Sequence, residues 1–353
     1  MRREGDRADR PYSTTPMVRY AVSVRLEENG SVKAGDFVEA RRRLEAKRKQ
    51  GGEKLTGAAE VVGLIRDGDH VAVGGCLFSR TPMVLVREIL RQRRRGLTVS
   101  RNLLCFEAEL MMVAGAVETI ITSWQGIGLP WGLSRVLRQH VESGRVRMEE
   151  WSHLGLGLRY RAAAMGIPFL PTLTMLGSDL MGVGEARTMA CPYTGETVAL
   201  VPALFPDVAI LHVHRADRFG NCQIDGYGHM DADIARAATT VLVTAEEIVD
   251  QEVFRRQPER TAIPGFVVDA VVHAPLGAYP GECYGLYETD FAHFDEYVAG
   301  IEADGMDGVG AYLDRFVYGP ATHQAYLELL DPARIERLRQ SARLLVSPEA
   351  AGV

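Results

Sequence analysis

The sequence predicts an α/β protein whose sheet is mostly parallel. Short runs rich in β-branched residues alternate along the chain with segments that have the apolar spacing of helices. These runs are apolar on both faces, which is typical of strands covered by helices on each side. Glycine and proline mark most of the boundaries between the elements.

The first part of this alternation ends near residue 166. Pro82 stands in the first turn of an expected helix, where its missing N–H costs no hydrogen bond. Gly166 and Pro168 end another. Helices are expected at 57–66, 82–92, 108–117, 132–144 and 152–166, and strands at 70–75, 97–100, 118–123 and 146–150.

The second part contains three further strands and then only helices. Strands are expected at 208–214, 239–246 and 266–274, and helices at 311–317, 323–330 and 332–346. The chain therefore divides into a polar extension (1–54), an α/β domain (55–290) and a helical C-terminal segment (291–353). The Arg/Lys-rich end of the extension predicts a solvated or partner-docking helix.

Composition narrows the function classes. The 353 residues are 46% hydrophobic and carry a formal net charge of -6, so neither a nucleic-acid surface nor an anionic-membrane surface is expected. No apolar run approaches the ~20 residues that span a bilayer, and the N-terminus lacks the apolar stretch of a signal peptide. Five scattered cysteines without a CxxC pair predict reduced thiols and a cytoplasmic protein.

Lysine is confined to the beginning of the chain. The lysines are Lys33, Lys47, Lys49 and Lys54, and every later fixed positive charge is arginine. Arginine stays protonated and is a poor nucleophile. The α/β domain therefore excludes mechanisms that need a lysine, such as a Schiff base, a pyridoxal phosphate anchor or a phosphate-loop lysine.

Two motif-like stretches are weak candidates. GIGLPWG (126–132) imitates a dinucleotide fingerprint, but Trp131 occupies the glycine position that allows close helix–strand packing. His212 and His214 share one face of a strand end, as in a metal-dependent hydrolase. Later histidines fall mostly in loops or helices and no lysine is available to bridge metals, so no metal site is expected.

Four glycine-rich loops flank the expected strands. They are GGCLFSRTP (74–82), LGSD (176–179), RADRFGN (215–221) and PLGAYP (275–280). Together they predict a crevice lined with backbone amides, suited to a phosphate, a carboxylate or an acyl oxyanion.

Four longer motifs make the chain similar to a known family. They are DGDHVAVGGCLFSRTPMVLVREI, YRAAAMGIPFLPTLTMLGSD, PYTGETVALVPALFPDVAILHVHRADRFGNCQI and IVDQEVFRRQPERTAIPGFVVDAVVHAPLGAYP. In order and spacing, residues 55–290 resemble the alpha subunit of family I CoA-transferases, in particular the glutaconate CoA-transferase A-subunit group. Cys76 and Arg80 replace a phenylalanine and a glycine of the wider signature, and Tyr279 stands where histidine is common.

The resemblance implies an open three-layer α/β/α sandwich and a homologous beta subunit, in an αβ or α2β2 assembly. It implies that a coenzyme A thioester is a substrate, that no cofactor is bound permanently, and that CoA moves between carboxylic acids, possibly dicarboxylates such as glutaconate. In this family a beta-subunit glutamate attacks the thioester, within a Ser-Glu-Asn-Gly-like motif that this sequence lacks.

The chemistry of this reaction suggests roles for individual residues. We expect the amides of Gly74 and Gly75 to stabilise the oxyanion, Ser79 to donate a hydroxyl, and Arg80 to bind the far carboxylate of a dicarboxylate. For Asn221 and Asp217, a structural role in a turn explains the residue types as well as a role in the site does. For Glu107 and Glu109, helix capping is an equally good explanation. The full set of expected substrate-binding residues is Ser79, Arg80, Glu107, Gly177, Ser178, Asn221, Gly277 and Ala278.

Two other functions remain open. CoA-transferase-like proteins of steroid-ring degradation hydrolyse a cyclic acyl-CoA, with a glutamate base on the alpha subunit, which would be Glu149 or Glu150 here. Alternatively, the chain is a scaffold whose partner performs all the chemistry.

Overall fold

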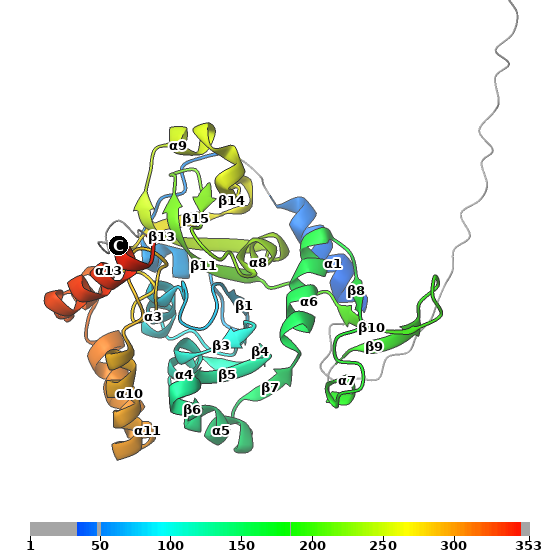
Figure 1. Ribbon diagram of the computed structural model, residues 1–353, viewed down its shortest axis with the longest axis horizontal. Helices are drawn as coiled ribbons and strands as arrows, with labels where there is room; N and C mark the ends of the chain where they lie inside the picture. Colours follow the sequence, from blue (N-terminus) through cyan, green and yellow to red (C-terminus); the bar gives the residue numbers. More distant parts are fainter. Residues whose placement is uncertain (1–33, 48–50, 184, 347–353) are drawn as a thin grey trace, which may run out of the picture.

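The computed structural model describes residues 34–47, 51–183 and 185–346. Its centre is a sheet of seven parallel strands in the order β7-β4-β2-β1-β11-β13-β15 (Figure 1). The strands are β1 (His70–Val73), β2 (Leu97–Ser100), β4 (Val117–Thr122), β7 (Arg147–Glu150), β11 (Val208–Ala216), β13 (Thr240–Ile248) and β15 (Ala270–His273). Two short antiparallel strands, β12 (Cys222–Gln223) and β14 (Thr261–Ile263), extend the end of β11.

Alternate residues of the parallel strands enter two separate cores. In β11, Ile210 packs in one core and Leu211 in the other, and Val71 and Ala72 of β1 divide in the same way. Because neighbouring strand residues point to opposite faces, both faces of the sheet are covered. This arrangement confirms the predicted three-layer α/β fold.

Different helices cover the two faces. One core contains residues of α2 (Ala58–Val62), α3 (Met83–Arg91), α4 (Phe106–Val113), α5 (Arg135–Glu142), α10 (Phe291–Asp304) and α11 (Met306–Leu313). The other contains residues of α6 (His153–Met165) and α8 (Asp231–Ala237). The remaining helices are α1 (Ala34–Ala46), α7 (Leu180–Val183), α9 (Gln251–Arg256), α12 (His323–Leu327) and α13 (Pro332–Val346).

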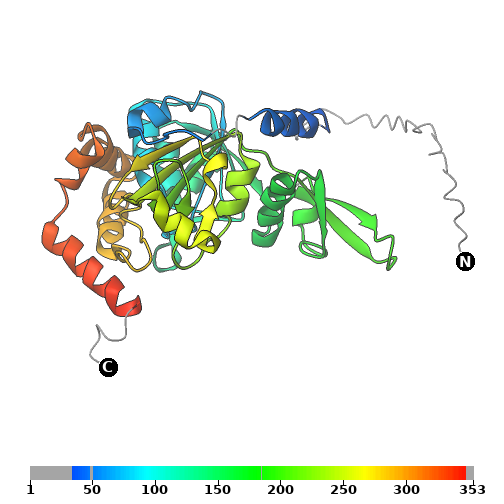
Figure 2. The ribbon, with the colours of Figure 1, turned by 90° about the horizontal axis from the view of Figure 1, so that it is seen from above.

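Two smaller sheets lie outside the central one. The first joins β3 (Leu103–Leu104), β5 (Trp124–Gly128) and β6 (Gly132–Leu133). The second is antiparallel, in the order β8-β10-β9, with β8 (Phe169–Thr172), β9 (Arg187–Ala190) and β10 (Thr197–Pro202). We call this second sheet the arm, and Figure 2 shows it projecting from the body beyond α6.

Several elements differ from the expected ones, and the β3-β5-β6 sheet was not expected. The strand expected at 266–274 is only Ala270–His273, because residues 265–267 form a 3-10 turn. The arm is not among the elements that the sequence predicts. Among the described residues, no helix is both long enough and apolar enough to cross a membrane.

Candidate functional site

The first glycine loop follows β1 and is held by hydrogen bonds within the chain. Gly74 N donates to Ile210 O at 2.9 Å, and Gly75 N donates to Asp231 Oδ1 at 2.7 Å. Gly75 has φ +69, and a Cβ there would lie 2.1 Å from Ser79 O, so only glycine fits the turn. An oxyanion can use the two glycine amides only by displacing these partners.

Arg80 ends this loop in a buried ion pair. Its side chain is 1% exposed, and it contacts Asp231, which is fully buried on α8. Its Nη1 also donates to His212 O at 2.9 Å, and its Nη2 donates to Tyr227 O at 2.8 Å. The guanidinium therefore faces protein acceptors and not solvent, so in this arrangement it is not placed to receive a substrate carboxylate.

A second buried ion pair, between Arg101 and Glu107, also contacts the first glycine loop. Arg101 Nη1 lies 2.7 Å from Glu107 Oε1, and both side chains are 1% exposed. Arg101 Nη2 donates to Thr81 Oγ1 at 3.0 Å, and its Nε donates to Gly75 O at 3.4 Å. Glu107 thus fixes the arginine that supports the loop and has no exposed face for substrate.

Glu246, at the carboxyl end of β13, gathers donors from three elements. It accepts hydrogen bonds from His212 Nε2 at 2.8 Å, Tyr287 OH at 2.6 Å, Leu276 N at 2.8 Å and Gly277 N at 3.0 Å. Burial works against its ionisation, but these bonds outweigh it and hold the pKa of Glu246 below its ordinary value. The carboxylate therefore pins the fourth glycine loop to β11 and β13.

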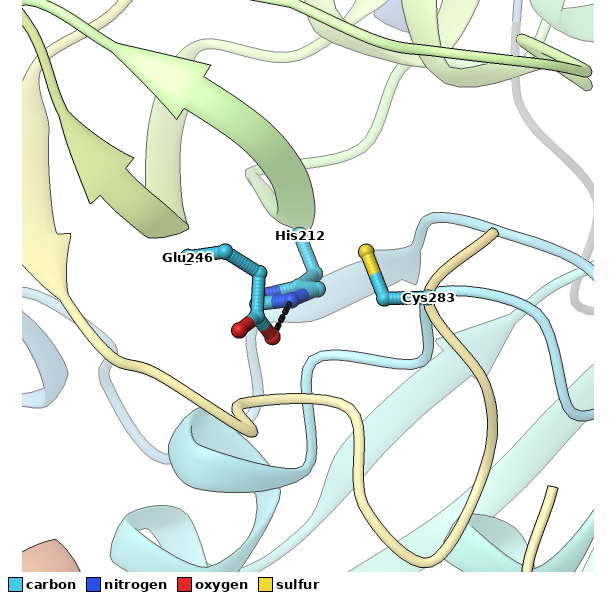
Figure 3. Close-up of side chains that lie close together, drawn as sticks. All are labelled: His212, Glu246 and Cys283. Carbon is cyan, nitrogen blue, oxygen red and sulfur yellow. Dashed lines mark hydrogen bonds and ion pairs between the residues drawn. The ribbon is translucent and has the colours of Figure 1, made fainter. Parts of the chain in front are cut away.

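His212, Glu246 and Cys283 form a cluster whose ligand atoms lie within 4.8 Å of one another (Figure 3). Histidine, glutamate and cysteine together suit zinc. However, His212 Nδ1 is already bonded to Thr244 Oγ1 at 2.8 Å and Nε2 to Glu246. Burial also raises the thiol pKa of Cys283 well above its ordinary value. The polar atoms are thus satisfied without an ion.

His214 does not join that cluster through its ring nitrogens. Its Nδ1 accepts from Asp225 N at 3.1 Å, and its Nε2 donates to Tyr284 O at 2.9 Å. Burial lowers the pKa of His214 to about 4. A shared His212–His214 metal site would require breaking one of these bonds and one of the two bonds of the His212 ring.

The first and fourth glycine loops are joined to each other. Arg80 N donates to Glu282 O and Glu282 N donates to Phe78 O, both at 2.9 Å. Gly277 packs so closely on His212 that a Cβ would lie 2.6 Å from its ring, and Ala278 N donates to Tyr287 OH at 3.1 Å. Loops 74–80 and 275–283 therefore form one connected unit, the loop unit, at the carboxyl edge of the sheet.

The other expected site residues lie in different surroundings. Asn221 accepts from Gly265 N at 2.9 Å and donates to Asp217 Oδ2 at 2.7 Å, which is turn chemistry. Ser178 Oγ donates to Met175 O at 2.7 Å, and Gly177 beside it has φ +78. Both belong to the connection between β8 and α7, outside the loop unit.

Glu149 and Glu150 lie at the end of β7, on the edge of the sheet. Three strand spacings separate β7 from β1, which amounts to roughly 14 Å. Glu149 accepts from Trp151 Nε1 at 2.6 Å and pairs with Arg159. The structure does not bring either glutamate to the first glycine loop.

Glu246, Asp231 and Tyr287 hold the loop unit from outside its two loops, and none of them was expected as a site residue from the sequence. A glutamate directly after the buried run TTVLVTA is a usable signal, because polar residues at the carboxyl ends of parallel strands commonly face a site. Asp231 is the first residue of α8, where an acid is common for local reasons, and its contact with Arg80 across 151 residues leaves no local pattern. Tyr287 likewise has no local signal.

Glu109, on α4, is a buried acid beside the site. Tyr297 OH donates to its Oε2 at 2.9 Å, and its Oε1 has no partner among the described residues. The side chain lines a cavity of about 60 Å³. Burial raises the pKa of Glu109 from 4.5 to about 7, and the hydrogen bonds of the carboxyl offset the burial only in part.

This raised pKa predicts a pH-dependent stability. The folded chain holds the Glu109 proton more tightly than the unfolded chain, so stability should fall as pH rises from about 4.5 to about 7. At 1.36 kcal/mol per pKa unit the loss is up to about 3 kcal/mol. In urea unfolding at pH 5 and pH 8, Glu109→Gln should lose less stability than the unchanged chain. Glu142→Gln, at an exposed position, is the control, and an equal pH response in Glu109→Gln contradicts the prediction.

Comparison with known proteins agrees with this geometry. The model of the family described as Coenzyme A transferase matches residues 55–274, which is more than half of the chain. The chain belongs to this family. The A-subunit of glutaconate CoA-transferase from Acidaminococcus fermentans is 34% identical over 294 residues, covering 78% of this chain and 91% of the relative. The crystal structure of that organism's enzyme superposes with a TM-score of 0.77 at 32% identity, covering 81% of this chain and 95% of the other.

Relatives of this CoA-transferase chain also include hydrolases. The cholesterol ring-cleaving hydrolase IpdA subunit of Rhodococcus jostii is 30% identical over 264 residues, covering 69% of this chain and 86% of the relative. The predicted family and fold are confirmed. Family membership alone leaves transfer and hydrolysis to be distinguished by the site.

Proposed function

We propose that this chain is the alpha subunit of a heteromeric CoA-transferase that moves CoA between carboxylic acids, with a glutamate nucleophile supplied by a beta subunit. The glutaconate CoA-transferase relative, which is itself one subunit of its enzyme, supports both the reaction and the subunit role. The substrates are an acyl-CoA thioester and a free carboxylate. The turn formed by residues 76–79 is partly accessible, and Ser79 provides its side-chain hydroxyl as a donor to the substrate.

The observation that carries this proposal is the state of the carboxylates in the loop unit. Asp231, Glu107 and Glu246 are the carboxylates that hold its two loops, and each already accepts hydrogen bonds from the chain. A carboxylate that attacks a thioester must be accessible to it. Apart from the half-exposed Glu282, the carboxylates at these loops are buried or nearly so, which favours a nucleophile supplied in trans against the turn formed by residues 76–79.

The hydrolase alternative requires a base on this chain near the thioester. Glu149 and Glu150 are three strands away from the first glycine loop, and Glu149 is already paired with Arg159. A general base must come within hydrogen-bond distance of the proton it removes. The geometry thus favours transfer over hydrolysis by these two residues.

Trapping the covalent intermediate tests the proposal. During transfer, the beta-subunit carboxylate becomes a CoA thioester, which borohydride reduces to an alcohol. The complex incubated with acyl-CoA and borohydride should lose CoA exchange, and the mass change should lie on the beta subunit. The chain alone should show no exchange, because it lacks the nucleophile.

The half-exposed Glu282 provides the sharpest control for this trap. Its backbone joins the two loops, so it is the carboxylate of this chain best placed to compete as nucleophile. Glu282→Gln should leave the trapped mass on the beta subunit unchanged. A modified glutamate in this chain, or exchange by this chain alone, overturns the assignment of roles.

A further inference from the structure

The arm has an apolar face that the chain leaves uncovered. In its antiparallel register, Leu200 lies opposite Pro171, Val198 opposite Met189, and Pro202 opposite Phe169. Directly paired residues point to the same side of a sheet. We call this set the arm face, and its members are Phe169, Pro171, Met189, Val198, Leu200 and Pro202.

The two sides of the arm differ sharply in burial. Ala199 and Val201, which point to the opposite side, are fully buried, and Val201 shares a core with residues of α6. On the arm face, Phe169 and Met189 are each 40% exposed, and Pro171 is exposed as well. One side of β10 is therefore packed on the body, and the arm face on the other side presents apolar side chains to solvent.

The arm face lies away from the glycine loops. Leu276 and Ala278 of the fourth loop, and Tyr287 after it, pack against residues of the C-terminal segment. In Figures 1 and 2 the arm and the C-terminal helices occupy opposite sides of the molecule. A partner that brings a carboxylate to residues 76–79 therefore does not need to cover the arm face.

Two charged residues mark opposite ends of the arm face. Arg187 lies opposite Leu200, so it belongs to the arm-face side. Glu196 is two residues before Val198, which places it on the same side near the hairpin turn. Both side chains are exposed, and neither forms an ion pair with a described residue. The face thus carries a positive charge toward one end and a negative charge at the other.

We propose that the arm face binds the arm face of a second copy of this chain about a two-fold axis. Such an axis pairs the same surface with itself and, with the arms antiparallel, sets Glu196 of each copy against Arg187 of the other. The two sheets pack face to face and bury the apolar set between them. The charge arrangement selects a second copy over an unrelated apolar partner, because the face is complementary to itself.

A charge-swap series on the full chain tests this pairing. Light scattering should show twice the chain mass of 38.8 kDa for the unchanged protein. Arg187→Glu and Glu196→Arg should each weaken self-association by about tenfold or more, because like charges then meet at both symmetric contacts. The double swap restores the opposite-charge pairing and should recover most of the association.

Substitutions on the two sides of β9 separate this contact from general damage. Met189→Glu, on the arm face, should give the mass of one chain. Thr188→Glu, on the exposed opposite side of the same strand, should keep twice that mass. A single-chain mass for the unchanged protein, or a double swap as weak as the single swaps, overturns the proposal. The proposal is also overturned if Met189→Glu abolishes binding of the beta subunit but leaves self-association unchanged, since the arm face would then bind that subunit.

Discussion

Asp231→Asn should lower the free energy of unfolding by roughly 3–5 kcal/mol. Removing this carboxylate leaves the Arg80 guanidinium, which is 1% exposed, without a counter-charge in the interior. It also disturbs the acceptor of Gly75 N, so loop 74–80 loses its link to α8. Urea or thermal unfolding of the purified chain measures the change directly.

The same helix offers a matched control for this substitution. Asp233 lies two residues further on α8 and faces Arg161 at 3.6 Å in a largely exposed pair. Asp233→Asn should therefore cost under about 1 kcal/mol. Replacing both partners, in Arg80→Met with Asp231→Leu, should cost less than Asp231→Asn alone, because no buried charge is left unpaired. Equal effects of the two asparagine substitutions would instead favour the substrate-binding role that the sequence suggested for Arg80.

Much of the fold was predictable because its determinants are local. Runs such as VAIL in β11 are apolar on both faces, and this pattern by itself indicates a buried parallel strand. The arm was missed because β9 consists of Arg187–Ala190, all exposed, with no apolar alternation to identify a strand. Pairing with β10, and not its own composition, makes that segment a strand.

Two of the four glycine loops meet as the sequence predicted, whereas the partners of the charged residues near them were not predicted. The glycine loops at 74–80 and 275–280 do meet, as expected for strand ends on one edge of a parallel sheet. Arg80 was expected to bind the far carboxylate of a dicarboxylate, because a guanidinium can form two parallel hydrogen bonds to a carboxylate. Its partner, Asp231, comes from a helix far along the chain, and only the folded structure brings the two together.

Glu246→Gln should be a second strongly damaging conservative change among the residues that hold the loop unit. The carboxylate accepts through both oxygens, from Leu276 N on one and from His212, Tyr287 and Gly277 on the other. Glutamine replaces one of these oxygens with an NH2 group, so this NH2 donor then faces the N–H or O–H donors that the oxygen accepted from. The lost charge-assisted bonds and one buried unsatisfied N–H together cost about 3 kcal/mol. Tyr287→Phe, which removes one bond only, should cost about half of that.

The pH dependence of the same variant distinguishes a charge effect from a packing effect. Because the folded pKa of Glu246 is lowered, its ionisation stabilises the fold above the unfolded value of 4.5. This contribution is lost as pH falls through the folded pKa. Unfolding measured between pH 7 and pH 3 should therefore show a smaller acid destabilisation in Glu246→Gln than in the unchanged chain. Parallel stability profiles would mean that Glu246 acts by shape alone.

Loop 275–283 also holds loop 74–80 through Glu282 and Phe78, so CoA exchange by the complex should fall in Glu246→Gln, even where the protein remains folded.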